Sequence, residues 1–307
     1  MSEVNKQLDN IIAAVGQVLL GKEEKIRLAL ACMLAKGHLL IEDLPGMGKT
    51  TLAHALAAVL GFSYRRVQFT SDMLPADILG TNIFDAEKRQ FVLHQGPIFT
   101  QLLLADEINR SSPKTQSALL EAMEEKQVSI DGQSTALPEP FFVIATQNPL
   151  HQSGTYPLPE SQLDRFLMQI SLGFPAHTVE RALLEGRNPR AVLSTIKPLV
   201  SVETWMTLQS QVDAVQASAS VLDYAQRLID RTRYSGNFQW GLSPRAALGL
   251  MQAARAWALL QHRQFVVPED IQSIFSAVVS HRLRYQMRDS QQSDPAKLVL
   301  DSVDVLG

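Results

Sequence analysis

Residues 38–52, HLLIEDLPGMGKTTL, place a lysine and two threonines directly after a glycine-bearing loop. The pattern G-x-x-x-x-G-K-[ST] binds nucleotide phosphates through backbone N–H groups, with the lysine at the β- and γ-phosphates and the hydroxyl on Mg²⁺. Lys49 and Thr50 fill those positions, and a helix that starts at Lys49 would point its positive end at the phosphates. We therefore predict a site for ATP and Mg²⁺. The predicted nucleotide-binding residues of the loop are Pro45, Gly46, Met47, Gly48, Lys49, Thr50 and Thr51.

One residue departs from the pattern, because Asp43 stands where the first glycine is expected. The alternative interpretation is an ordinary glycine-rich turn between a strand and a helix, with a surface lysine. A second motif is therefore needed to decide between a nucleotide site and a turn.

Two acids end the apolar run QLLLADE, residues 101–107, and supply that second motif. An all-apolar run is typical of a strand buried on both faces of a parallel sheet, and ligands bind at the carboxyl ends of such strands. We expect Asp106 to bind Mg²⁺ opposite Thr50, and Glu107 to polarise the water that attacks the γ-phosphate. A pair of solvated acids is the alternative.

A third polar strand end follows FFVIAT, at Gln147-Asn148-Pro149. The amide of Asn148 could hold the attacking water or the γ-phosphate, and Gln147 is an alternative for the same role. Asn-Pro is also a plain turn signal.

Two arginines are the remaining candidates. Arg165 lies in LDRF, where it could reach a neighbouring subunit's nucleotide as an arginine finger, or pair with Asp164 or Glu160. Arg245 lies in GLSPRAAL, in the first turn of a predicted helix, where the helix dipole disfavours a cation. Its position indicates a nearby anion, for which ATP phosphate is a natural candidate.

The elements that position these residues divide the chain in two. Strands alternate with helices through residues 1–175, which predicts an α/β domain, and helical patterns dominate residues 176–307. Residues 81–95 read as an inserted β-hairpin, with a surface loop as the alternative, and QVSIDGQSTAL reads as a second hairpin around Asp131-Gly132. ATP would then bind between the α/β core and a helical lid.

The composition limits the classes of binding partner and the cellular compartment that we expect. The net charge of −3 over 307 residues provides no basic field, so nucleic acid is an unlikely partner. The single cysteine, Cys32, lies in an apolar helical stretch and is expected to be a buried hydrophobe. No 18 apolar residues run together, so we expect no membrane span and a cytoplasmic protein.

Five motifs in this order, PGMGKT, LLLADEINR, ATQNP, LDRF and GLSPRA, resemble the MoxR family of AAA+ ATPases over nearly the whole chain. An acid is common in that family at the position of Asp43. The resemblance implies a three-layer αβα core with a parallel sheet and inserted hairpins, followed by an all-α lid. It also implies roles for the site residues: Walker A (Lys49, Thr50), Walker B (Asp106, Glu107), sensor 1 (Asn148), arginine finger (Arg165) and sensor 2 (Arg245).

The same resemblance implies an assembly and a function. We expect a homo-oligomer, a hexameric ring, that hydrolyses ATP with Mg²⁺ and presents its hairpins to the central pore. The family is chaperone-like, and its members work on client proteins with a von Willebrand factor A domain partner, in maturation or metal insertion. The alternatives are a DNA-acting AAA+ motor, for which Lys88 and Arg89 offer a small basic surface, and a motor subunit of a metal chelatase.

Overall fold

The computed structural model describes residues 3–149, 155–186, 189–286 and 294–305. Within these residues, five parallel strands form one sheet in the order β2-β5-β8-β1-β9. The strands are β1 (Leu39–Glu42), β2 (Tyr64–Gln68), β5 (Leu102–Asp106), β8 (Phe142–Gln147) and β9 (Met168–Ile170). Their carboxyl ends share one edge, so the ends of β5, β1 and β8 bring together the predicted site residues that follow these strands, Asp106, Glu107, Lys49 and Asn148 among them.

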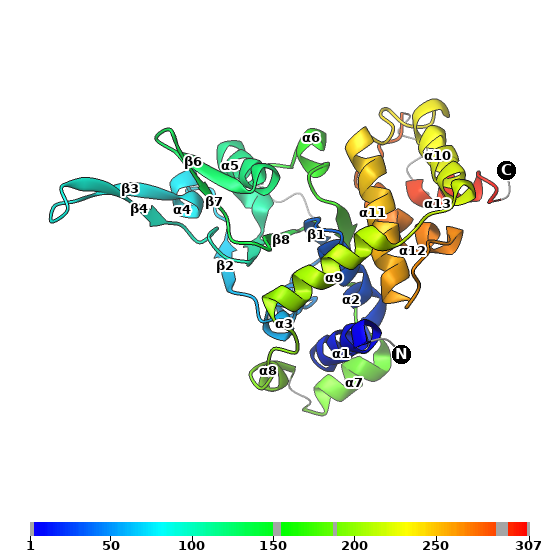
Figure 1. The fold of residues 1–307 in the computed structure, drawn as a ribbon, viewed down its shortest axis with the longest axis horizontal. Helices are drawn as coiled ribbons and strands as arrows, with labels where there is room; N and C mark the ends of the chain where they lie inside the picture. The colour runs from blue at the N-terminus through cyan, green and yellow to red at the C-terminus, as the bar shows by residue number, and fades with distance from the viewer. Residues whose placement is uncertain (1–2, 150–154, 187–188, 287–293, 306–307) are drawn as a thin grey trace.

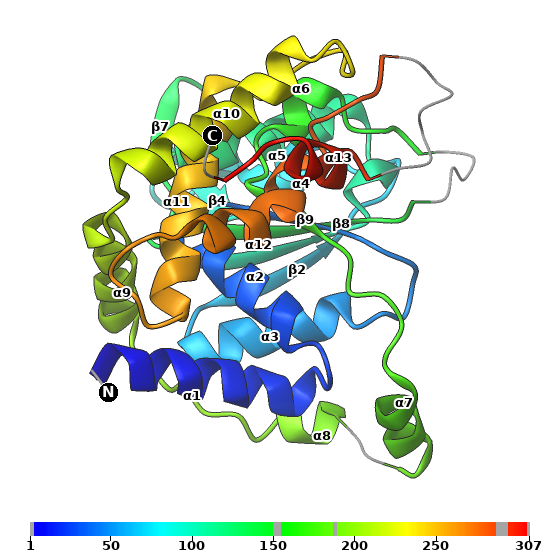
Figure 2. The same ribbon diagram turned by 90° about the vertical axis from the view of Figure 1, so that its right-hand side faces the viewer.

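The sheet is buried on both faces, as the apolar runs predict. Leu39 and Ile41 of β1 belong to a hydrophobic cluster with α1 (Glu3–Val18), α2 (Glu23–Leu34) and α3 (Lys49–Leu60). Leu40, between them, belongs to the cluster on the opposite face, which includes α4 (Pro75–Leu79) and α5 (Pro113–Glu125). The two-residue repeat of a strand explains this alternation, and the result is a three-layer αβα core (Figure 2).

Both predicted hairpins are present. β3 (Gly80–Asp85) pairs with β4 (Gln90–Gln95), and β6 (Gln127–Ile130) pairs with β7 (Gln133–Ala136). The β3–β4 hairpin extends far beyond the body of the molecule (Figure 1), which excludes the alternative of a surface loop. Asn82 Nδ2 donates to Asp131 Oδ2 at 2.8 Å, so the base of one hairpin contacts the turn of the other.

The C-terminal part is helical. It comprises α7 (His177–Leu184), α8 (Pro189–Leu193), α9 (Val202–Ala214), α10 (Ala219–Tyr234), α11 (Pro244–Leu260), α12 (Pro268–Val279) and α13 (Pro295–Asp301). Serine side chains cap α9, α10 and α11 by accepting a backbone N–H in the first turn. Among these helices, α8 packs against α1 and α3, on the side of the sheet that carries the phosphate loop's helix.

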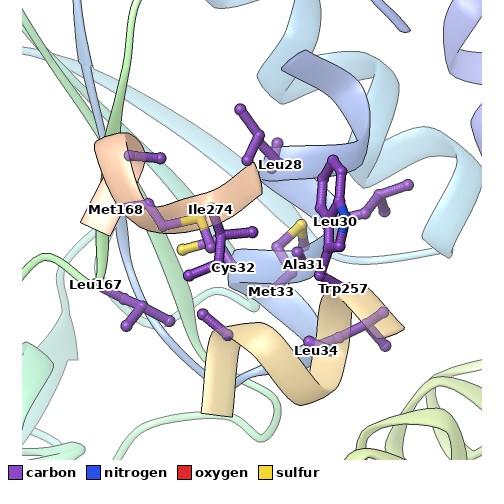
Figure 3. Packing of buried hydrophobic residues seen from close by; sticks show 14 of the residues in the cluster. Leu28, Leu30, Ala31, Cys32, Met33, Leu34, Leu167, Met168, Trp257 and Ile274 are labelled. Carbon is purple, nitrogen blue, oxygen red and sulfur yellow. The ribbon is translucent and has the colours of Figure 1, made fainter. Parts of the chain in front are cut away.

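Helix α2 joins the two parts. Its buried side chains lie between the end strand β9 and helices α11 and α12, where Trp257 and Ile274 meet them (Figure 3). Cys32 is fully buried in this contact, and burial raises the pKa of its thiol, which confirms the expected buried hydrophobe. The core and the helical part therefore share one continuous hydrophobic cluster.

Candidate active site

The loop between β1 and α3 has the backbone that a phosphate site needs. Gly46 has φ 85° and Gly48 has φ 93°, in the left-handed region that favours glycine. Helix α3 begins at Lys49, as predicted, and the Lys49 side chain is buried. Lys49 Nζ donates to the carbonyl oxygens of Asp43 at 2.5 Å and Leu44 at 3.3 Å. The ammonium group is thus held inside the loop, at the amino end of the helix.

Asp43, the departure from the glycine pattern, has a structural role. Its Oδ2 accepts the backbone N–H groups of Leu172 and Gly173, both at 2.7 Å, and its Oδ1 accepts the N–H of Leu44 at 2.9 Å. Charge-assisted bonds of this kind are stronger than neutral ones. The carboxylate therefore fastens the start of the phosphate loop to the segment that follows β9.

Asn148 joins the ends of three strands. Its Oδ1 accepts from Lys49 Nζ at 3.1 Å, and its Nδ2 donates to Glu107 Oε1 at 3.2 Å. Gln147 instead donates to Glu42 Oε2 at 3.0 Å. Of the two amides considered, Asn148 is therefore the one that contacts both the loop lysine and the predicted general base.

The acid pair sits in a network of donors that the sequence did not reveal. Thr146 donates its hydroxyl to Asp106 Oδ1 at 2.6 Å and accepts the N–H of Glu107 at 2.9 Å. Arg66 Nη2 of β2 donates to Asp106 Oδ2 at 2.7 Å. Glu107 Oε2 accepts from Gln68 Nε2 at 2.8 Å and Arg110 Nη1 at 3.0 Å. Both carboxylates are thus oriented, and Glu107 itself has a left-handed backbone with φ 56°.

The electrostatics of the loop centre on the ammonium group of Lys49. Burial lowers the pKa of Lys49, and the charges of Asp43, Asp106 and Glu107 oppose that shift. A bound triphosphate would add negative charge beside the ammonium group and favour its charged form.

The donor set also fits Mg²⁺. Magnesium is usually held by one or two carboxylates together with substrate phosphates, and here Asp106 lies at the sheet edge while Thr50 lies in the first turn of α3. The described residues contain no cluster of three or more His, Cys, Asp or Glu side chains that could hold a metal by itself. The expected ion is therefore one bound jointly by the chain and the nucleotide.

A mainly apolar cavity of about 210 Å³ lies directly beside the phosphate loop. Its walls come from Gly46–Gly48 and Thr51, from the end of α1 through Lys22, and from Gly173 through Leu183 on the way into α7. Lys22 Nζ closes one side by donating to the carbonyl of Phe174 at 2.6 Å. No local feature of the sequence predicts that the segment after α1 and the start of α7 meet there.

The two predicted arginines meet at one acid. Arg165 Nη2 lies 3.1 Å from Glu124 Oε2, and Arg245 Nη2 contacts Glu124 Oε1. Neither arginine is among the described residues that line the cavity beside the phosphate loop. The anion beside Arg245 in this structure is therefore the Glu124 carboxylate.

The sequence neighbours considered as partners of Arg165 have other contacts. Asp164 pairs with Arg282 at 2.7 Å, and Glu160 pairs with Arg284 at 3.7 Å. The structure thus brings Lys49, Asp106, Glu107 and Asn148 together at the sheet edge and gathers Arg165 and Arg245 at a separate acid.

Comparisons with known proteins agree with this architecture. The family model described as "ATPase family associated with various cellular activities (AAA)" matches residues 38–168, and the "AAA lid domain" model matches residues 230–299. Chaperone MoxR1 of Mycobacterium tuberculosis is 38% identical over 90% of this chain and 75% of its own. Uncharacterized protein YeaC of Bacillus subtilis is 44% identical, over 92% of this chain and 88% of its own.

A solved structure extends the likeness to the whole fold. The crystal structure from Cytophaga hutchinsonii, assigned as an ATPase, superposes with a TM-score of 0.88 at 34% identity. The match covers 98% of this chain and 95% of that one, so it includes the core and the helical part together.

Proposed function

The chain belongs to the MoxR family of AAA+ ATPases, and from that membership we propose that it couples ATP hydrolysis to remodelling of client proteins. It is an ATP hydrolase by family. The observation that carries the proposal is the joint contact of Asn148 with Lys49 and Glu107, which links the phosphate loop to the catalytic acid.

Each residue of this site has a chemical task in the proposal. The loop N–H groups and Lys49 bind the β- and γ-phosphates, and Asn148 orients the attacking water. Glu107 accepts the proton of that water as the water oxygen bonds to the γ-phosphorus, while the bond from the γ-phosphorus to the β–γ bridging oxygen breaks and ADP leaves. Mg²⁺, held by Thr50, Asp106 and the phosphates, would supply charge neutralisation on the phosphate oxygens. The apolar cavity beside the loop would receive the adenine base.

We propose that Arg165 and Arg245 both act on the nucleotide of a neighbouring subunit in a hexameric ring. Their shared contact with Glu124, apart from the cavity beside their own phosphate loop, supports this assignment. It departs from the expectation that the anion near Arg245 is the phosphate of an ATP bound between the subunit's own core and lid. We propose a functional division at residue 175, which lies between the end of the last strand, β9, at Ile170 and the start of α7 at His177.

The exposed end of the β3–β4 hairpin is the proposed client contact. Phe84 and Phe91 pack edge to face across the two strands and are 55% and 71% exposed. Exposed apolar surface of this kind marks interaction sites for proteins. Of the two cations considered for nucleic acid, Lys88 lies 3.7 Å from Asp85, which weakens the basic surface of the turn. A protein client is therefore favoured over DNA.

Further parts of the proposal rest on the family alone. A partner with a von Willebrand factor A domain and a role in maturation or metal insertion come from the resemblance to chaperone-like relatives. A cytoplasmic location is proposed because the enzyme needs a compartment that holds ATP. Among the residues that the structure describes, no helix combines the length and the apolar character needed to cross a bilayer.

Steady-state ATP hydrolysis by wild type and Glu107→Gln tests the catalytic assignment. We expect Glu107→Gln to bind nucleotide normally and to lose roughly 10²–10⁴-fold in turnover, as for loss of a general base. Glu125→Gln, an exposed acid of α5, is the matched control and should hydrolyse at the wild-type rate. Equal turnover by Glu107→Gln and wild type would refute the assignment.

The Glu107→Gln variant also tests whether the β3–β4 hairpin contacts a client protein. Glu107→Gln with ATP should retain a client protein, and the same variant with Phe91→Ser should release it. If both retain the same protein equally, the hairpin is not the contact.

A further inference from the structure

We propose that Glu124 is a positioning residue for ATP hydrolysis: it holds Arg165 of the core and Arg245 of the lid side by side, so that both reach the neighbouring subunit's γ-phosphate together. The inference rests on the proposed action of these arginines on a neighbour, and it adds a residue that none of the motifs contains.

The geometry at Glu124 divides one carboxylate between two guanidinium groups. Oε2 lies 3.1 Å from Arg165 Nη2, while Oε1 contacts Arg245 Nη2. Each guanidinium has five N–H donors in a planar fork, so most donors of both arginines remain for another acceptor. The Glu124 and Arg165 side chains are 32% and 28% exposed, and that of Arg245 is 52% exposed. The pair thus lies where a second subunit could reach it.

The charges explain why a carboxylate is needed there. Two guanidinium groups at one place repel each other, and the single negative charge between them offsets this repulsion. One acid and two bases leave a net charge of +1 on the cluster. A polyanion such as a triphosphate would still be attracted, while the two arginines stay together without it.

The backbones that carry the arginines are already fixed to each other. Asp164, next to Arg165, accepts the hydroxyl of Ser243 at 2.9 Å, and Ser243 is the N-cap of the helix that carries Arg245. Arg282, which is almost fully buried, donates to Asp164 Oδ1 at 2.7 Å and to the carbonyl of Phe166 at 2.6 Å. The segments LDRF and GLSPR therefore form one unit across the core–lid boundary.

Because the two backbone segments are fixed to each other, the remaining conformational freedom is that of the two arginine side chains. Arginine carries many rotamers, and an exposed guanidinium has to be ordered before it can bind a phosphate. Glu124 supplies that order from a third element, α5, whose exposed side it occupies close to the helix's end. Its loss leaves the fold's apolar contacts intact but frees both side chains.

The size of the effect can be bounded. Removal of an arginine finger costs roughly 10³–10⁵-fold in turnover, and a displacement of about 1 Å in a catalytic group can cost roughly 10²-fold. A loss of Glu124 leaves both arginines present but misplaced. We expect turnover to fall roughly 10- to 100-fold in Glu124→Ala, with the KM for ATP within about threefold of wild type, because the subunit's own phosphate loop is untouched.

The test measures kcat and KM of the assembled protein, with trapping of ADP–aluminium fluoride as a second readout. Glu124→Ala should lower kcat and abolish the trapped complex, which mimics the transition state. Glu124→Gln, which keeps the shape and one acceptor oxygen, should lie between Glu124→Ala and wild type. Glu125→Ala, its exposed neighbour, is the control and should match wild type. Gel filtration with nucleotide shows whether each variant assembles. If Glu124→Ala does not assemble, the comparison of Glu124→Gln with wild type provides the test.

A variant cycle separates positioning from general structure. In an Arg165→Ala, Arg245→Ala background, loss of Glu124 should cost nothing more, because there is nothing left to position. An equal loss in that background, or unchanged turnover in the single variant, overturns the proposal. If the arginine variants themselves turn over ATP like wild type, the proposed function of the arginines fails, and the role of Glu124 fails with it.

Discussion

His38 lies directly before β1, and its contacts predict how the free energy of unfolding depends on pH. Its Nδ1 accepts the backbone N–H of Val143 at 3.0 Å, and its Nε2 lies 3.3 Å from the carbonyl of Met123, so the neutral ring satisfies both partners. Burial, first, and the charge of Lys126 lower the pKa of His38 from its ordinary 6.5 to about 4. The folded state therefore resists protonation.

The sign follows from proton linkage. Between about pH 4 and pH 6.5 the unfolded chain binds a proton at His38 that the folded chain does not, so the free energy of unfolding rises with pH across that window. The contribution is fully present above pH 6.5 and is lost as the pH falls. From pH 7.5 to pH 5 it amounts to about 2 kcal/mol for a shift of this size.

Urea unfolding of wild type and His38→Asn at pH 7.5 and pH 5 measures this contribution of His38 to the free energy of unfolding. Asparagine keeps an acceptor for the Val143 N–H but cannot take up a proton, so we expect the variant to lose about 2 kcal/mol less than wild type on acidification. His281, also buried and with its pKa lowered well below the usual value, accounts for part of the fall that remains. The same pH dependence in both proteins would refute the assignment of a buried neutral imidazole.

Three further predictions concern the site and the hairpin. Asp43→Gly, which restores the general loop pattern, should destabilise the fold by roughly 1–3 kcal/mol in urea unfolding, because three N–H groups lose their acceptor, whereas Asp43→Asn should cost less. Arg66→Ala should lower the Mg²⁺ concentration needed for half-maximal binding of a fluorescent nucleotide by roughly 2- to 5-fold, since the half-exposed arginine pairs with Asp106, the proposed Mg²⁺ ligand; an unchanged Mg²⁺ dependence contradicts that competition. Phe91→Ser should leave the unfolding midpoint and basal ATP turnover unchanged, because the ring is 71% exposed, and a shift in the midpoint would show that the ring packs against the fold.

The elements that carry the site were predictable because their signals are local. Apolar runs before Asp106 and Gln147 indicate strands buried on both faces, and both are such strands in the structure. Lys49 and Gly61 mark the start and end of α3, and Asp131-Gly132 marks a hairpin turn. Helices α4, α8 and α13 were not predicted, because five to seven residues are too few to show a helical repeat.

Contacts between residues that lie far apart in the sequence could not be predicted from such local signals. Local sequence offers Arg165 the acids Asp164 and Glu160, one and five residues away, but the acid that it contacts is Glu124 on α5. Arg66 faces Asp106 only because β2 lies next to β5, and strand order is a property of the whole sheet. Such contacts depend on topology, and a single sequence contains no local signal for it.

The polar contacts of the site also explain how a bound phosphate could be felt elsewhere in the subunit. Lys49 donates to Asn148, and Asn148 donates to Glu107, so one amide separates the cation proposed to bind phosphate from the acid proposed as the general base. A γ-phosphate at Lys49 would compete for the donor that Asn148 now accepts from. Any change at Asn148 then reaches Glu107, whose other donors come from β2 and from the turn that precedes α5. Glu107, the proposed general base, and Glu124, the proposed holder of the arginine pair, both lie on the continuous stretch from the end of β5 to the end of α5, while Arg165 and Arg245 meet that stretch from other elements.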